Sequence, residues 1–338
     1  MISVPLSALE LTWVQEGHSA QEALADTVEM ARRVERLGYR RFWVGEHHST
    51  YVSAGVAPAV IIAQVAASTS SIMVGSGGVM LSNHAPFAVA EQFATLDALH
   101  PGRIDLGIGS GAGTMNERAV QALRRSSMGR GATDYARDVR ALIEFLAGGM
   151  ATDDLMLLPW YESSTPLWLL ATSEHGAALA ADLGLPLVVG HHIRPENTAS
   201  TVARYREVFQ PSRWSGRPYV MLSVQAVCAD SDERAEVLSR PADLLRADLV
   251  AGRTPTLLSP EAASFYEPSG DDLDVIVEAR KHQVRGGPDT VVRRLAKLVA
   301  ECRADELMIM TPVYDLAERT RSFELIVTTV AAEVANRG

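Results

Sequence analysis

The sequence predicts an α/β fold of the TIM (β/α)8-barrel type, and two observations support this prediction. Eight short apolar segments each precede a longer segment with helical spacing, and strands that alternate with helices are typical of a parallel sheet. The chain of 338 residues is long enough for one barrel with insertions, and no linker divides it. Residues 1–338 are therefore expected to form a single domain.

The predicted strands are short apolar runs, several of them rich in β-branched residues. In chain order they lie in SVPLSALEL (3–11), RRFWVGE (40–46), SIMVGSGGVML (71–81), GRIDLGIGSG (102–111), PLWLLATS (166–173), LPLVVG (185–190), YVMLSVQAVCA (219–229) and ADELMIMTPV (304–313).

The predicted helices follow these strands. The first is expected over residues 20–37, where Gly38 ends it, because glycine readily adopts the left-handed conformation that follows many helices. The others are expected over residues 57–68, 87–99, within the segment up to 147, and over 177–183, 195–209, 231–250 and up to 334.

Two excursions do not fit the simple repeat. Residues 148–166 precede the fifth strand, and residues 251–272, which are rich in Pro, Ser and Gly, precede the eighth. Long loops in compact domains are often functional, and barrel enzymes have their active sites at the C-terminal ends of the strands. Both excursions are candidates for active-site lids, and tolerated surface insertions explain them equally well.

Composition excludes several classes of partner. The net charge is −10 and no basic patch is present, so neither nucleic acid nor an anionic membrane is an expected partner. No signal peptide and no membrane-spanning segment is found, which predicts a soluble cytoplasmic protein. Cys228 and Cys302 lack zinc-site spacing and suit a reducing compartment.

Barrel geometry directs attention to the residues just after each strand. The candidates are Glu46, His47 and His48, Gly77 and Gly78, Ser110 to Gly113, Thr172 and Ser173, and His191 and His192.

A metal site is disfavoured, because adjacent strand residues such as His47 and His48 point to opposite faces and no His-x-His motif is present. A serine nucleophile is also weakly supported, because Ser110 lies in IGSGA rather than in G-x-S-x-G. Gly107, Gly109 and Ala112 match a loose G-x-G-x-x-A motif, but no acidic residue ends a suitable following strand, so a dinucleotide site is poorly supported.

Two other features favour a ligand. Gly77 and Gly78 are adjacent glycines inside a predicted strand, which indicates either a flat ligand lying against the strand or an unusual peptide bond. Thr172 and Ser173 offer two hydroxyls at a predicted helix start, which suits a helix N-cap and a phosphate-binding turn equally.

Taken together, several segments resemble the bacterial-luciferase-like family of flavin-dependent monooxygenases, over nearly the whole chain. They are GYRRFWVGEHHS, VGSGGVMLSNHAPFAVAEQFATLDALHPGRIDLGIG, LGLPLVV and ADELMIMTPVYD.

The resemblance implies a TIM barrel that binds reduced FMN (FMNH2), supplied by a separate NAD(P)H:flavin reductase, at its C-terminal mouth. The implied reaction inserts one oxygen atom from O2 into a small organic substrate through a flavin C4a-hydroperoxide, with an aromatic polyketide as a candidate substrate. A homodimer is also implied. Two alternatives stay open: an oxidoreductase that uses the deazaflavin F420, and a non-catalytic flavin-binding protein of the same fold.

The resemblance also implies roles for individual residues. His47 corresponds to a histidine beside the flavin ring, and Glu46 to the acid that accompanies it. Gly77-Gly78 corresponds to a pair joined by a cis peptide bond against the ring. The remaining implied cofactor-binding residues are Thr172, Ser173 and Gly176 on the phosphate side, Gly109, and His191 facing the cofactor.

Two positions depart from the family pattern. Many relatives have an arginine where this chain has Ser110, and Ser or Thr where it has Gly176. A charge-assisted hydrogen bond contributes ~1.5–3 kcal/mol, so its loss predicts loosely bound flavin. Arg130 and Arg194 are candidate replacement cations.

Overall fold

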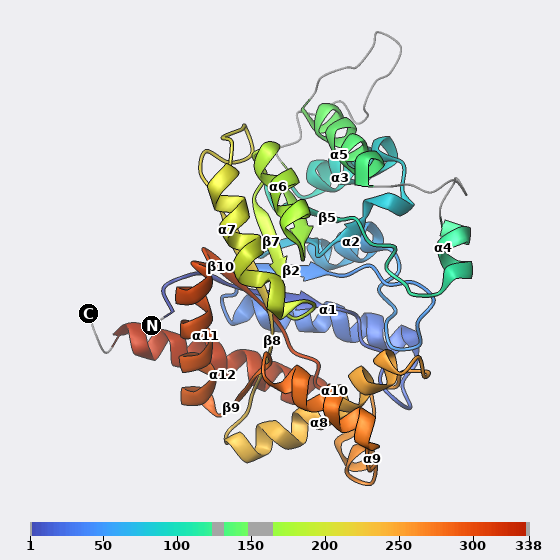
Figure 1. Cartoon of the computed structure of the whole chain (residues 1–338), viewed down its shortest axis with the longest axis vertical. Helices are drawn as coiled ribbons and strands as arrows, with labels where there is room; N and C mark the ends of the chain where they lie inside the picture. The colour runs from blue at the N-terminus through green and yellow to red at the C-terminus, as the bar shows by residue number, and fades with distance from the viewer. Residues whose placement is uncertain (1, 124–131, 148–164, 336–338) are drawn as a thin grey trace.

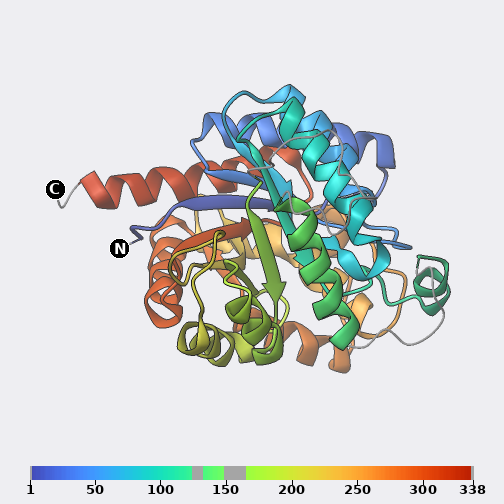
Figure 2. The same cartoon turned by 90° about the horizontal axis from the view of Figure 1, so that it is seen from above.

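The computed structural model describes residues 2–123, 132–147 and 165–335, which form a closed barrel of parallel strands surrounded by helices (Figure 1 and Figure 2). The barrel strands are β1 (Leu6–Glu10), β2 (Arg41–Val44), β3 (Met73–Ser76) with β4 (Val79–Met80), β5 (Ile104–Gly109), β6 (Leu167–Ala171), β7 (Leu187–Gly190), β8 (Val220–Cys228) and β10 (Glu306–Met310). The barrel closes because β10 pairs with both β1 and β8. The TIM-barrel prediction is confirmed, and each predicted strand segment contains a strand.

The third barrel strand is interrupted at Gly77 and Gly78. β3 pairs with β2 and with the start of β5, and β4 pairs with the end of β5. The peptide bond between the two glycines is cis, as predicted. The backbones are so close here that a Cβ atom on Gly107 would lie 2.2 Å from the carbonyl oxygen of Ser76. Glycine is therefore required where β5 passes β3.

The helices around the barrel are α1 (Ala20–Arg36), α2 (Pro58–Ser68), α3 (Pro86–Leu99), α4 (Glu117–Leu123), α5 (Ala132–Leu146), α6 (Glu174–Asp182), α7 (Thr198–Val208), α8 (Asp232–Val250), α9 (Pro260–Ser264), α10 (Gly270–Arg280), α11 (Pro288–Cys302) and α12 (Leu316–Ala335). Ser19 begins α1 with a capping box, in which its side chain and that of Glu22 satisfy each other's backbone N–H groups. No helix within the described ranges is long and apolar enough to cross a membrane.

The segment between β8 and β10 holds more structure than the sequence predicted. The excursion over residues 251–272 contains the short α9 and the start of α10, each of which has a serine N-cap (Ser259 and Ser269). α10, β9 (Val284–Gly286) and α11 were not predicted. The other excursion lies outside the described residues over 148–164. α8, α9 and α10 pack together beside the barrel (Figure 1).

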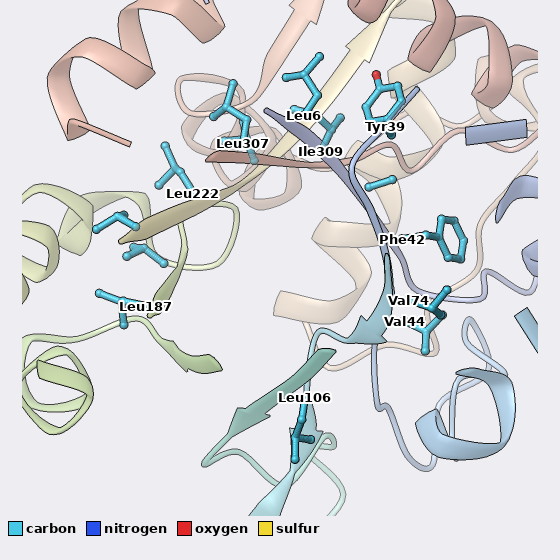
Figure 3. Packing of buried hydrophobic residues seen from close by; sticks show 14 of the residues in the cluster. Leu6, Tyr39, Phe42, Val44, Val74, Leu106, Leu187, Leu222, Leu307 and Ile309 are labelled. Atoms are coloured by element: carbon cyan, nitrogen blue, oxygen red, sulfur yellow. The ribbon is translucent and has the colours of Figure 1, made fainter. Parts of the chain in front are cut away.

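The core has two layers, on the two faces of the barrel wall. Leu6, Phe42, Val74, Leu222 and Ile309 belong to the larger cluster, which packs between strands and helices (Figure 3). The smaller cluster fills the barrel interior with residues that include Leu9, Trp43, Trp168, Val188 and Met308. Strand alternation explains this division, because neighbouring residues point to opposite faces.

A buried ionic network crosses the barrel interior at the N-terminal ends of the strands. Arg41 lies 2.6 Å from Asp105 Oδ2 through Nη1 and 3.0 Å from Glu306 Oε1 through Nε. The Trp43 indole donates to Asp105 and the Tyr219 hydroxyl donates to Glu306. Burial raises the pKa of Asp105, and the positive charge of Arg41 opposes that shift. Arg41 thus offsets the cost of burying two carboxyl groups.

Arg41→Leu should lower the free energy of unfolding by about 3–5 kcal/mol, because it leaves two buried carboxyl groups without their cation. Arg40→Leu is the matched control: Arg40 is the preceding residue, its side chain is exposed, and its loss should change stability by less than about 0.5 kcal/mol. Chemical denaturation of the two variants beside the wild type measures both values. Equal stabilities for the two variants would contradict the assignment.

Candidate active site

A cavity of about 600 Å³ opens at the C-terminal ends of the barrel strands. We call it the first cavity. Eight of the site residues predicted from the sequence line it: Glu46, His47, Gly77, Gly109, Ser110, Thr172, Ser173 and Gly176. Gly78 and His191 are not among its lining residues. The lining also includes His192, a candidate from barrel geometry, and six residues that the sequence did not single out: Met80, Ser82, Tyr135, His175, Ile193 and Ser223.

Glu46 is a buried carboxylate that holds several segments together. Its Oε1 lies 2.8 Å from His48 Nε2 and 2.9 Å from His84 Nε2, and its Oε2 accepts the N–H of Met80 at 2.9 Å. Burial alone would raise the pKa of Glu46, but the hydrogen bonds with His84 and His48 bring this pKa below its ordinary value. Glu46 therefore remains ionised and fully occupied as an acceptor.

His47 lines the first cavity with an imidazole that has spare hydrogen-bonding capacity. Its backbone N–H donates to the carbonyl of Gly55, which fixes the main chain. Its buried Nδ1 has no partner among the described residues. Burial lowers the pKa of His47, and nearby His48 lowers it further. At neutral pH the ring is uncharged, so it offers one N–H donor and one acceptor.

His192, rather than His191, lines the first cavity. The Nδ1 atom of His192 lies 3.0 Å from the hydroxyl oxygen of Ser223, whereas Nδ1 of His191 lies 2.8 Å from the Thr198 hydroxyl oxygen. Val188 and Gly190 also line this cavity. Extending the strand alternation from these two residues would have selected His192, so the signal was present in the sequence.

The end of the cavity at α6 is polar but carries no fixed positive charge. Ser173 is the N-cap of α6, and Thr172, His175 and Gly176 line the cavity beside it. Neither Lys nor Arg occurs among the described residues that line this cavity. Arg194 is exposed and lies outside this lining, and Arg130 lies outside the described residues.

Gly176 also has a steric explanation. A Cβ atom at this position would lie 2.7 Å from the Cβ of Ala171, so any larger residue requires Ala171 to move. A serine or threonine hydroxyl is thus excluded from this turn by the neighbouring side chain.

A comparison with known proteins places the chain in a family. The family model for luciferase-like monooxygenases matches residues 8–305. The chain belongs to the luciferase-like monooxygenase family. A "Luciferase-like monooxygenase" of Escherichia coli (strain K12) is 36% identical over 96% of each chain. An N-acetyl-S-alkylcysteine monooxygenase of Bacillus subtilis is 31% identical, over 97% of this chain and 99% of the relative.

Among solved structures, the crystal structure of apo-MsnO8 is similar over almost the whole chain. It has a TM-score of 0.90 and 35% identity, and the match covers 97% of this chain and 98% of MsnO8. The sequence-level resemblance to the luciferase-like family is therefore confirmed for both fold and family.

The first cavity suits the flavin that the luciferase-like family implies. Its volume lies within the range of cofactor sites. Leu9, Leu170, Val188 and Met308 provide an apolar wall for a flat ring, and the α6 turn provides hydroxyls for a polar tail. His47 places an imidazole ring in the same lining. Among the described residues, no group of three or more His, Cys, Asp or Glu is arranged to hold a metal ion.

The stability of this luciferase-like protein should fall as the pH is lowered from 7 to 5. Burial lowers the pKa of His192 to about 4, whereas an unfolded histidine has a pKa near 6.5. The unfolded chain therefore binds the extra proton first, and unfolding becomes easier by about 1–2 kcal/mol. His192→Asn should flatten the slope of unfolding free energy against pH, measured by denaturation at several pH values. His18→Asn, which removes an exposed histidine, is the control variant. An unchanged slope in His192→Asn would contradict the assignment.

Proposed function

We propose that the protein is a flavin-dependent monooxygenase that inserts one oxygen atom of O2 into an organic substrate, with FMNH2 supplied by a separate flavin reductase. The observation that carries the proposal is the first cavity, whose lining combines the uncharged ring of His47 with apolar side chains. Membership of the luciferase-like monooxygenase family supports the reaction class. When bound there, reduced flavin supplies the electrons that activate O2.

The protein's own residues have three tasks in this proposal. The apolar wall formed by Leu9, Leu170 and Val188 excludes water from the reacting groups, which protects reactive species from hydrolysis. His47, which lines this cavity, donates or accepts a proton there through its ring. Glu46 acts as a positioning residue: it holds the segment that carries His47 against Met80 and His84.

The flavin-binding residues in this proposal line the same cavity. Gly77 and Gly109 lie beside the ring, and Thr172, Ser173 and Gly176 hold the phosphate at the α6 turn. Gly78, joined to Gly77 by the cis bond, shapes the strand behind the ring. His191 is assigned a structural part, because it is buried and hydrogen-bonded to Thr198 away from this cavity.

The substrate proposal starts from the relatives. The N-acetyl-S-alkylcysteine monooxygenase shows that a relative covering this whole chain acts on a thioether-bearing amino acid derivative. Aromatic polyketides and S-alkyl thioethers are thus the two substrate classes to test first. Incubation with FMNH2, O2 and each candidate should give a product 16 mass units heavier. Titration with FMN and F420 beside oxygen uptake distinguishes the F420 alternative, which consumes no oxygen.

We also propose that the protein is a homodimer located in the cytoplasm. Val60 on α2 is 71% exposed and Val56 before it is 50% exposed. Apolar side chains gathered on an outer helix are typical of surfaces that bind another protein, which supports dimer contact through α2.

His47→Ala should reduce the rate of substrate oxygenation about 10²–10⁴-fold, because positioned acid–base groups contribute factors of that size. The fold and flavin affinity should be retained, as measured by circular dichroism and FMN fluorescence. His100→Ala is the matched control, because His100 lies at the opposite end of the barrel from the cavity, after α3 and before β5. An oxygenation rate in His47→Ala equal to that of the wild type would contradict the acid–base role of His47.

FMN should bind weakly, and the protein should purify without colour, because the cavity lining described here offers no Lys or Arg to the phosphate. Ser110→Arg should tighten FMN binding about 10–100-fold, since it adds one charge-assisted hydrogen bond. Riboflavin, which lacks the phosphate, should bind wild type and variant equally in fluorescence titrations. Tight stoichiometric FMN in the purified wild type would contradict the proposal.

A further inference from the structure

A second cavity of about 550 Å³ lies beside the first, against α8 and α10. His192 and Ile193 line both cavities, so the segment after β7 is their common wall. The remaining lining residues are His191, Pro195, Glu196, Gln225, Arg246, Asp274, Val275, Glu278, Ala279, His282 and Gln283. Nothing in the flavin-binding proposal uses this cavity.

Arg246 is the distinctive residue of the second cavity. It is half-buried, and within the described ranges its guanidinium has neither an ion pair nor a hydrogen bond. Asp243 on the same helix pairs with two other arginines, since its Oδ2 lies 2.8 Å from Arg280 and 3.0 Å from Arg285. Arg246 is nevertheless close enough to His192 to lower the pKa of that ring. A half-buried cation with no protein partner is a natural binding point for an anion.

The other charges of this cavity belong to its rim. Glu196, Asp274 and Glu278 are exposed to solvent, and Glu278 already pairs with Lys281. Exposed carboxylates are hydrated and screened by salt, so they oppose an anion at Arg246 only weakly. Among the described lining residues, Arg246 is therefore the one Lys or Arg, and it is less exposed than the three carboxylates.

Gln283 adds a second feature at the inner wall. It is 7% exposed, and its buried Oε1 accepts no hydrogen bond from any described residue. A buried amide oxygen without a donor is costly, so the Gln283 side chain gains a hydrogen bond when it turns toward a ligand N–H group in this cavity. Arg246 and Gln283 together match a molecule that carries a carboxylate and an amide N–H.

We propose that the second cavity binds the carboxylate and amide of an N-acylated amino acid, with Arg246 as the anion-binding residue and Gln283 as the N–H acceptor. The side chain of this ligand passes His192 and Ile193 into the first cavity. Binding to the second cavity requires no flavin. The further statement that this ligand is the substrate rests on the proposed monooxygenase function.

The test is calorimetric titration of flavin-free protein with N-acetyl-L-methionine and with its methyl ester, in which an uncharged ester replaces the carboxylate. The acid should bind wild type about 10–100-fold more tightly than the ester. Arg246→Ala should remove this preference and leave the ester affinity unchanged, and Arg246→Lys should restore part of it. Gln283→Leu should weaken acid and ester alike, because both contain the N–H group.

Arg294→Ala is the matched control. Arg294 is also half-buried, lies on α11, and is absent from the lining of both cavities, so its loss should leave both affinities unchanged. Equal binding of acid and ester by wild type, no binding of either, or wild-type acid affinity in Arg246→Ala would overturn the proposal. FMN titration of the same variants should match wild type, so failure of the flavin proposal would be seen separately.

Discussion

The buried side chain of Arg41 determines which part of the barrel is filled and which part is hollow. Arg41 extends from β2 and pairs with Asp105 on β5 and with Glu306 on β10. One guanidinium therefore links strands on both sides of β2. A buried cation between two carboxyl groups tolerates little displacement, because loss of either contact leaves a charge unpaired in a poorly polar interior. The N-terminal half of the barrel is thereby closed.

The aromatic layer above Arg41 depends on the same network. The Trp43 indole donates to Asp105 and its ring packs edge-on against Trp168, with 5.5 Å between ring centroids. Arg41 lies over the Trp168 ring at 4.8 Å, which adds a cation–π contact. Trp43 also lines the first cavity. Along the barrel interior, the ionic network contacts the aromatic layer, and Trp43 of that layer lines the first cavity.

Much of this architecture could be predicted from the sequence, because the barrel strands are continuous apolar runs with local signals. The interruption between β3 and β4 could also be predicted, because two adjacent glycines mark it in the sequence. The family resemblance assigned the cofactor-facing position to His191, whereas His192 lines the first cavity. The strand β7 ends at Gly190, and a match by position in the sequence does not report which way side chains point beyond a strand end. Arg246 could not be found, because nothing within α8 distinguishes an unpaired arginine from the paired Arg280 of α10.

The placement of positive charge gives the two cavities different binding properties. Under the proposed function, the flavin is delivered by a reductase and leaves after each turnover, and a phosphate site without a described Lys or Arg suits that exchange. A substrate that must wait for reduced flavin gains from a fixed cation, because a charge-assisted contact slows dissociation more than it speeds association. In this proposal, weak phosphate binding at the α6 turn allows the flavin to exchange, while the free guanidinium of Arg246 retains the substrate. His192 lines both cavities, and its pKa is lowered first by burial and then by nearby groups that include Arg246, so it adds no competing charge beside the ligand.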